Sequence, residues 1–377
     1  MSKDVFIIDG IRSAIGNFGG SLAPVRTDDL AAHAIRSLME RNQGFDPKLI
    51  EDVIFGCANQ AGEDNRNVAR MAGLLAGLPH ELGGETVNRL CASGMGATVN
   101  AARAIKDGAG DIYISGGVEN MTRGPWVISK TSKPFGRDAQ MFDSAFGWRF
   151  INPKMEELYG TDGMGQTAEN LAEMYNIDRE SQDRFAAWSQ EKAAKAIASG
   201  RLAEEIAPIT IPQRRKDDII FAQDEFSRPS STVDILSKLR PAFKKDGTVT
   251  AGNASGLNDG AAALLVASDQ AVKDHGFKPL ARIVSAAIAG VEPRIMGIGP
   301  VYASEKALKR AGLTLADMDI LELNEAFAAQ VLACTRKMGV DDRDERINPN
   351  GGAIALGHPL GMTGARILHS AAIELQK

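Results

Sequence analysis

Short apolar runs alternate with longer helical segments along the first third of this 377-residue chain. The apolar, β-rich runs lie at residues 5–8, 53–56, 86–90 and 111–117, and helical spacing separates them at 27–40, 65–76 and 92–106. This alternation predicts a parallel or mixed β-sheet with helices on its faces, and therefore an α/β fold. The run at 111–117 is apolar enough for burial on both faces of that sheet.

The alternation breaks at about residue 120 and resumes near residue 249. The intervening stretch is richer in charge, proline and aromatic residues, and it holds one strong helix at 181–199. A buried strand returns at 261–267, and a second α/β set is then expected, with strands at 281–288 and 320–323 and helices at 304–311 and 324–338. The two sets are similar in pattern rather than in residue identity, which suggests an internal duplication.

Composition excludes several classes of protein. Hydrophobic residues make up 44% and charged residues 24% of the chain, a balance typical of globular proteins rather than disordered ones. No apolar run reaches about 18 residues, so we expect no membrane span. The formal net charge of -5 argues against a general nucleic-acid binder, which needs a basic face.

The three cysteines, Cys57, Cys91 and Cys334, form neither a Cys-x-x-Cys pair nor an even set for disulfides. We also find no secretion signal at the N-terminus, and together these features favour a reduced, cytoplasmic location. The sequence lacks a phosphate-binding loop, a dinucleotide fingerprint, a metalloprotease motif, a serine-esterase elbow and structural-zinc spacing. We therefore expect no metal site.

Cys91, in the segment 88–97, lies where an expected strand becomes a helix. Unpaired amide groups at a helix N-terminus carry partial positive charge, which favours the thiolate form of a nearby cysteine. Small residues such as Gly94 and Gly96 would let another backbone or a thioester approach closely. A buried small hydrophobe is the more common role of a free cysteine taken alone, but the strand-to-helix junction favours a nucleophile.

His358 lies in the segment 350–364, which is too rich in glycine to form a regular helix or strand. Pro359 keeps His358 out of helical geometry. Histidine suits a general base because its pKa lies near neutrality. The alternative is a tight surface turn with an incidental histidine. The other four histidines lack such surroundings.

Asn324 also falls at an expected strand-to-helix junction, within residues 322–328. It could be an N-cap, for which asparagine is favoured. Alternatively, its amide could orient a water or donate toward a developing oxyanion. Residues 249–260 form a small-residue loop that could line a narrow channel or be only a tight turn.

Cys91 in its setting, Asn324 in Asn-Glu-Ala-Phe and His358 in Gly-His-Pro together resemble the thiolase family. The motifs occur in the family's order, and the resemblance runs the whole length of the chain. Residues 55–70 and 147–153 are most similar to the 3-oxoadipyl-CoA thiolases, which act late in aromatic-acid breakdown.

The resemblance implies an α/β thiolase fold of two duplicated βαβαβαββ halves in a five-layered α/β/α/β/α arrangement. Residues 1–120 with 249–272 would form the N-terminal half, and residues 273–377 the C-terminal half. Residues 121–248 would form a loop domain over the active site. The expected partners are CoA thioesters, and the expected assembly is a homodimer or a homotetramer.

The resemblance also implies roles for individual residues. Cys91 takes the acyl group as a thioester, His358 accepts the Cys91 proton, and Asn324 stabilises a thioester oxyanion through a water. Coenzyme A is a substrate and product rather than a resident cofactor. Five positions match its contacts in the family: Arg228 and Ser255 as polar contacts, and Met164, Phe243 and Phe327 as pocket walls.

One family motif has no counterpart in this sequence. Thiolases supply the proton for the departing carbanion equivalent from a second cysteine in a glycine-rich segment near the C-terminus. The sequence ends at Lys377, before such a segment and before the last strands of the second half, and Cys57 and Cys334 lie in other contexts. We expect the natural chain to continue. The alternative is a protein unable to run the carbon–carbon step, such as a non-catalytic acyl-CoA carrier.

The substrate is a separate question. Arg149 or Arg137 could pair with the free carboxylate of a 3-oxoadipyl chain, because both lie in the 121–248 stretch, near the aromatic Trp148 and Phe150. Solvated surface charge is the alternative for both. A biosynthetic acetoacetyl-CoA thiolase is a second reading within the same chemistry.

Overall fold

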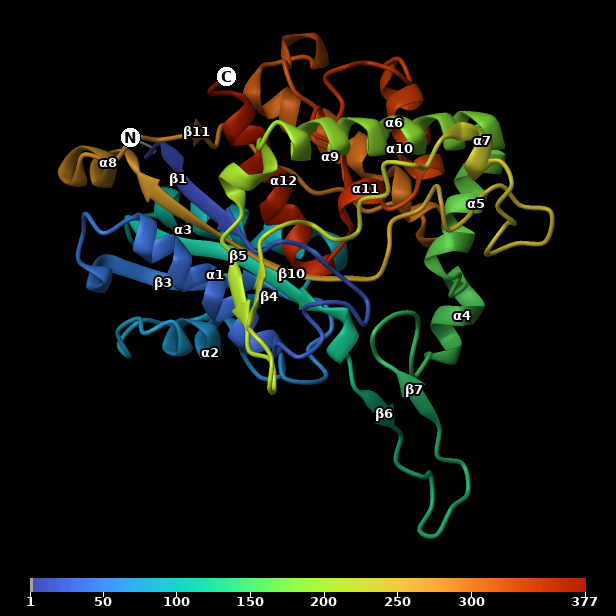
Figure 1. Cartoon of the computed structure of the whole chain (residues 1–377), viewed down its shortest axis with the longest axis horizontal. Helices are drawn as coiled ribbons and strands as arrows, with labels where there is room; N and C mark the ends of the chain where they lie inside the picture. Colours follow the sequence, from blue (N-terminus) through green and yellow to red (C-terminus); the bar gives the residue numbers. More distant parts are fainter. Residues whose placement is uncertain (1–2) are drawn as a thin grey trace.

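A mixed sheet of seven strands forms the centre of the structure, a computed structural model that describes residues 3–377 (Figure 1). Its strands are β1 (Val5–Arg12), β2 (Gly16–Asn17), β3 (Ile50–Gly56), β4 (Glu85–Val87), β5 (Ile112–Asn120), β10 (Asn258–Ser268) and β11 (Ala281–Arg282). Their order is β11–β1–β10–β5–β3–β4, with β2 beside β10. β3 is parallel to β4 and β5, whereas β10 is antiparallel to β1 and β5. The expected α/β class is confirmed.

Helices cover both faces of this sheet (Figure 1). α1 (Thr27–Arg41) and α2 (Val68–Leu75) pack together on one face, and α3 (Ser93–Asp107) and α12 (Leu360–Glu374) pack together on the other. Alternate residues of β10 serve the two cores, since Ala263 and Leu265 face α1 while Leu264 and Val266 face α3 and α12. Burial on both faces explains the unbroken apolar run at 261–267.

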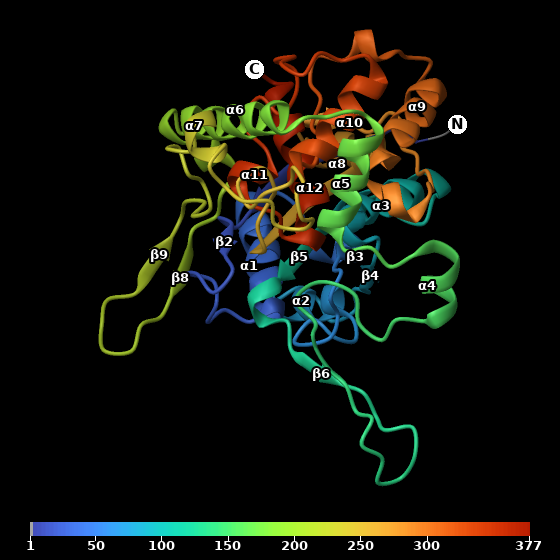
Figure 2. The ribbon, with the colours of Figure 1, turned by 90° about the vertical axis from the view of Figure 1, so that its right-hand side faces the viewer.

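The chain between β5 and β10 leaves the sheet, as expected. Two hairpins project from the body in Figures 1 and 2. They are β6 (Trp126–Ile128) with β7 (Met141–Asp143), and β8 (Ile209–Ile211) with β9 (Ile219–Phe221). The helices of this stretch are α4 (Pro153–Tyr159), α5 (Met164–Met174), α6 (Arg179–Ala198) and α7 (Val233–Leu236).

Buried Arg12, at the end of β1, ties this stretch to the sheet. Its guanidinium pairs with Glu205 at 2.9 Å and with Asp224 at 2.7 Å. Both carboxylates come from the 121–248 stretch. The division of the chain into two halves and a loop domain stays a prediction.

The second α/β set is more helical than expected. Its helices are α8 (Asp269–His275), α9 (Gly299–Ala311), α10 (Ala328–Met338), α11 (Ala353–Leu356) and α12. The prediction of strands at 281–288 and 320–323 is wrong for most of these residues. The first segment has only the two-residue strand β11, and the second has one parallel bridge between Leu321 and Ile347. An apolar pattern makes a strand only where another strand pairs with its backbone, and no other described strand lies beside these segments. The predicted five layers include two large sheets, and residues 3–377 form one of them, the seven-stranded sheet. In this range, no helix has both the length and the apolar character that crossing a bilayer requires.

Candidate active site

Cys91 lies in a 3-10 turn, Leu90–Ala92, between β4 and α3. The preceding strand ends at Val87, so the last part of the expected strand 86–90 belongs to this turn. Ser93 fixes the turn, because its Oγ accepts from Arg89 N at 2.9 Å and donates to Leu90 O at 2.6 Å. Leu90 has a φ of 51°, a left-handed conformation that is costly for a leucine. Side-chain bonds and a strained backbone thus hold the position of Cys91.

Glycines bring the Cys91 turn against the segment that carries His358. α3 begins just after Cys91 and α12 just after His358, and the backbones of the two helices approach closely where glycines face each other. A Cβ on Gly94 would lie 2.7 Å from Gly361 O, and Gly117 of β5 packs on the same carbonyl. The close approach expected at the small residues after Cys91 is therefore an approach of the α12 backbone.

The Cys91 thiol is neutral in the resting protein. Part of the residue reaches solvent, whereas Cys57 and Cys334 are buried. Protein atoms nevertheless surround the sulfur, so that burial raises the pKa of Cys91 to about 11, and the negative charge of Glu119 adds to the rise. The helix N-terminus alone does not ionise this thiol, because burial outweighs the backbone hydrogen bond that lowers its pKa. A base must take the proton when the substrate arrives.

His358 is buried, and its hydrogen bonds assign a role to each ring nitrogen. Nδ1 lies 2.8 Å from Thr363 Oγ1, which donates its own proton to Pro359 O at 2.9 Å. The hydroxyl has one proton, so it must accept from Nδ1–H, which leaves Nε2 with a lone pair that can accept a hydrogen bond or a proton. Burial and the positive charge of Arg366 lower the pKa of His358 to about 3, well below the expected neutral range. The imidazole is therefore neutral, which is the form that a general base needs.

Asn324 lies beside this lone pair. Its Nδ2 is 3.2 Å from His358 Nε2, so the amide donates to the imidazole. The N-cap reading is wrong, since α10 begins at Ala328 and its N-cap is Phe327. Within the described chain, the buried Oδ1 of Asn324 has no hydrogen-bond partner. This geometry supports a role for Asn324 at the reacting carbonyl.

Polar residues that the motif analysis did not single out hold these segments in place. Glu325 is fully buried and accepts from Ser189 Oγ at 2.6 Å, which fixes the Asn-Glu-Ala-Phe segment to α6. Asn258 accepts from His358 N at 2.9 Å. Both residues lie in segments noted from the sequence, 322–328 and 249–260, so the sequence could have indicated a role for them. Thr363 also lies in a noted segment, 350–364, but a threonine in a glycine-rich helix start has no pattern that predicts its contact with the histidine.

The three apolar positions matched to coenzyme A contacts share one surface. Phe327, three residues after Asn324, meets Phe243 edge-on, with ring centroids 5.9 Å apart. Phe243 packs on Gly165, next to Met164 at the start of α5. Met164 and Phe243 are both partly exposed and available to a ligand.

The two polar positions lie on a second line of contacts that starts at the same motif. Ser255 N donates to the carbonyl of the residue before Phe327, at 2.9 Å. Arg228 places its guanidinium over the ring of Phe226, 5.6 Å from the centroid, and that ring packs on Gly256 beside Ser255. The five positions thus lie on two short lines of contacts that both start at residues 326–327, and their role as coenzyme A contacts stays a prediction.

Comparisons with known proteins match nearly the whole chain. The family model for the thiolase N-terminal domain matches residues 5–270, and that for the thiolase C-terminal domain matches residues 277–377. The chain belongs to the thiolase family, which confirms the resemblance seen in its motifs.

Individual relatives match over full length. The chain is 56% identical over 375 residues to the 3-oxoadipyl-CoA/3-oxo-5,6-dehydrosuberyl-CoA thiolase of Escherichia coli (strain K12), covering 100% of this chain and 94% of that protein. A beta-ketoadipyl-CoA thiolase of Acinetobacter baylyi is 54% identical over the same shares. Among solved structures, the acetyl-CoA acetyltransferase of Bacillus anthracis has a TM-score of 0.91 at 42% identity and covers 100% of this chain and 93% of that one. Human mitochondrial 3-ketoacyl-CoA thiolase has a TM-score of 0.92 at 40% identity, covering 99% and 92%.

Proposed function

We propose that this chain is an acyltransferase, a thiolase that cleaves 3-oxoadipyl-CoA with coenzyme A to give acetyl-CoA and succinyl-CoA. Coenzyme A serves as substrate and product, with no resident cofactor. The substrate is supported by identities of 54–56% over 375 residues to relatives named for 3-oxoadipyl-CoA or beta-ketoadipyl-CoA. The observation that carries the chemistry is the backbone crossing that sets the Cys91 turn against the start of α12, directly after His358.

The residues suggest the order of events. The Cys91 sulfur attacks the C3 carbonyl of the substrate while His358 Nε2 takes its proton, so that two neutral groups form an ion pair as the oxyanion develops. Asn324 holds the oxyanion through a water. The C2–C3 bond then breaks, and its electron pair leaves with the acetyl-CoA fragment. That fragment takes up the proton that His358 accepted from Cys91, so the imidazole is neutral again. The succinyl group stays on Cys91 until the thiol of coenzyme A attacks it.

Arg149 is the residue that we propose to bind the distal carboxylate. It is half-buried, and its guanidinium contacts the backbone carbonyls of Ser144 and Asn59, both at 3.4 Å, with no described carboxylate at ion-pair distance. Asn59 adjoins Ala58, whose carbonyl accepts from Asn88 beside the nucleophile turn, at 3.0 Å. An unpaired charge on the loop next to the nucleophile suits an anionic acyl chain.

Arg137 is a poorer candidate and a useful control. It is exposed in the connection between β6 and β7, which projects from the body (Figures 1 and 2). A side chain on this connection has no described contact with the loop next to Cys91.

Arg149→Ala is expected to lower kcat/KM for 3-oxoadipyl-CoA by about 10- to 100-fold, the loss typical of one charge-assisted hydrogen-bonding partner. Turnover of 3-oxohexanoyl-CoA, which has a methyl group in place of the carboxylate, should change little. Arg137→Ala should leave both rates unchanged. Equal losses for the two substrates would show that Arg149 acts on the structure alone.

A wild-type preference for acetoacetyl-CoA would contradict the proposed substrate. It would favour the biosynthetic alternative, which is suggested by 45% identity to an acetyl-CoA acetyltransferase of Thiocystis violacea.

A non-catalytic acyl-CoA carrier is the alternative from another class. A thiolase mixed with acetyl-CoA gains one acetyl group on its nucleophilic cysteine, and a carrier gains none. Mass spectrometry of the intact protein and of the Cys91 peptide distinguishes them, and an unmodified protein would rule out the acyltransferase proposal.

We also propose that the chain acts in the cytoplasm as a homodimer or homotetramer. The β6–β7 hairpin and its connection expose large apolar side chains that an assembly would cover: Trp126, Ile128, Phe135 and Met141. Mass photometry showing monomers alone would contradict this assembly.

A further inference from the structure

Glu119, a buried carboxylate near the end of β5, receives backbone hydrogen bonds from two distant parts of the chain. Its Oε2 accepts from Ala58 N at 3.0 Å and from Gly361 N at 2.8 Å, and its Oε1 accepts from Asn59 N at 3.0 Å. Ala58 and Asn59 follow β3, in the loop that touches the Cys91 turn. Gly361 lies in the first turn of α12, directly after the His358 segment. One side chain therefore joins the surroundings of the nucleophile to the helix that follows the base.

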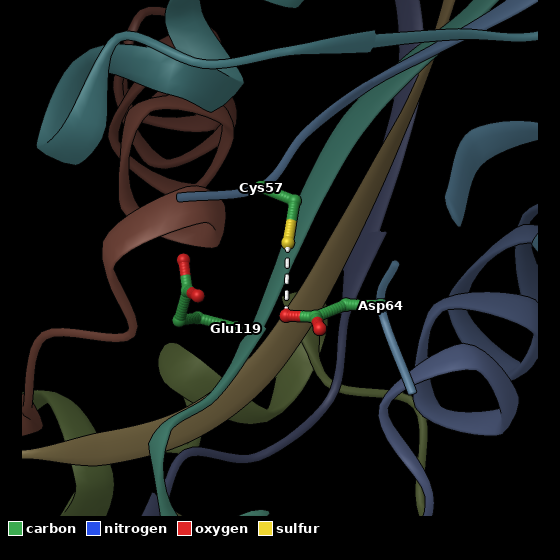
Figure 3. Close-up of side chains that lie close together, drawn as sticks. All are labelled: Cys57, Asp64 and Glu119. Carbon is green, nitrogen blue, oxygen red and sulfur yellow. Dashed lines mark hydrogen bonds between the residues drawn. The ribbon is translucent and has the colours of Figure 1, made fainter. Parts of the chain in front are cut away.

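Glu119 belongs to a buried cluster with Cys57 and Asp64, whose possible ligand atoms lie within 4.8 Å of one another (Figure 3). These groups do not suit a cation. Asp64 already accepts from Cys57 Sγ at 3.4 Å, from Gln60 N at 3.1 Å and from Gly62 N at 2.9 Å. Donors that point at both carboxylates would repel a metal ion. Burial also raises the pKa of Cys57 well above its usual value, so its thiol keeps the proton. The cluster is better described as a hydrogen-bonded anchor.

The charge of Glu119 also reaches the nucleophile, since it contributes to the raised pKa of Cys91. Burial raises the pKa of Glu119 itself to about 7, against the three amide donors that favour its ionised form. The other titratable groups around it are Asp64 and Cys57 on the β3 loop and Cys91 in the turn after β4. Among these groups, Asp64 adds to the rise in the pKa of Glu119.

We propose that Glu119 is a positioning residue that holds the start of α12, and with it His358, against the loop beside Cys91. It touches neither the substrate nor the reacting atoms. Gly361 N is one of the unpaired amides at a helix N-terminus, where a carboxylate is well placed as a capping partner. The expected effect of Glu119 on turnover rests on the proposed function. The expected effect of its charge on the pKa of Cys91 does not.

Two variants separate the charge of Glu119 from its reach. Glu119→Gln keeps the length but removes the charge, and its amide NH₂ would face a backbone donor. Glu119→Asp keeps the charge but is one methylene shorter, so it cannot hold both segments. We expect both variants to slow acetylation of Cys91 by acetyl-CoA by about 10- to 100-fold, because small displacements of a catalytic group cost rates of this order. Only Glu119→Gln should shift the pH profile of Cys91 alkylation by iodoacetamide to lower pH.

Asp64→Asn is the matched control, because Asp64 lies in the same cluster but bonds only within its own loop. It should lower the melting temperature while leaving the acetylation rate and the alkylation profile of Cys91 unchanged. Equal slowing in Asp64→Asn, or wild-type acetylation in both Glu119 variants, would overturn the proposal. So would an unshifted alkylation profile in Glu119→Gln. If the wild type is not acetylated at all, the proposed function fails, and the alkylation profile still decides whether Glu119 acts on Cys91.

Discussion

Cys91→Ser is expected to lower the rate of thiolysis by about 10⁴-fold or more, which is the order seen when a covalent nucleophile is removed. A thiol with a pKa of about 11 gives up its proton to His358 only as the acyl carbon is attacked. A serine hydroxyl is far less acidic, and an imidazole whose pKa is about 3 is too weak a base to activate it.

The measurement is the acetyl adduct on the Cys91 peptide, together with steady-state thiolysis. Cys334→Ala is a suitable control, because Cys334 is buried in α10 and donates to Gly297 O at 3.2 Å, with no contact to His358 or Asn324. That variant should retain the adduct. Persistence of the acetyl adduct in Cys91→Ser, on any other cysteine, would refute Cys91 as the nucleophile.

His358→Ala is expected to lower the same rate by about 10²- to 10⁴-fold, the usual contribution of a positioned general base. His369→Gln should leave this rate nearly unchanged. His369 is an equally buried imidazole of α12, but it lies against Gly10 on β1, away from Asn324.

The pH dependence gives a second check. A depressed folded pKa means that the His358 imidazole stays neutral as pH falls below 6.5 and gains its proton only near pH 3. The wild-type acylation rate should therefore show no loss near pH 6.5 that comes from His358. Such a loss in the wild type, absent from His358→Ala, would contradict the neutral imidazole described above.

The sequence predicted the parts of this fold that depend on local pattern. β5 and β10 were recognisable because each is buried along its whole length, and α6 because its helical spacing is long and uninterrupted. The strands expected at 281–288 and 320–323 failed because pairing is a property of neighbours, which an apolar pattern does not reveal. The helix expected from Asn324 starts at Ala328 instead, since buried Glu325 is held by α6 and keeps the segment extended.

The sequence predicted candidate site residues that the structure brings into neighbouring segments, but it did not predict their protonation states. Cys91, Asn324 and His358 stood out because each lies in an unusual local setting. The directions in which their pKa values move depend on burial by segments that come from elsewhere in the chain, and no local pattern reports that. The role of Glu119 could not be predicted from the sequence either. It depends on backbone amides from distant parts of the chain that donate to its carboxylate.

The backbone crossing at Gly94 and Gly361 makes reactivity depend on positions that have no functional group. A methyl group at Gly94 would push α12 away from α3, and one at Gly361 would push α12 away from the ends of β3 and β5. Either change would displace the His358 segment relative to the Cys91 turn. An alanine at either position would therefore lower the rate of catalysis although every reactive side chain is still present. Adding an external base would not restore that rate.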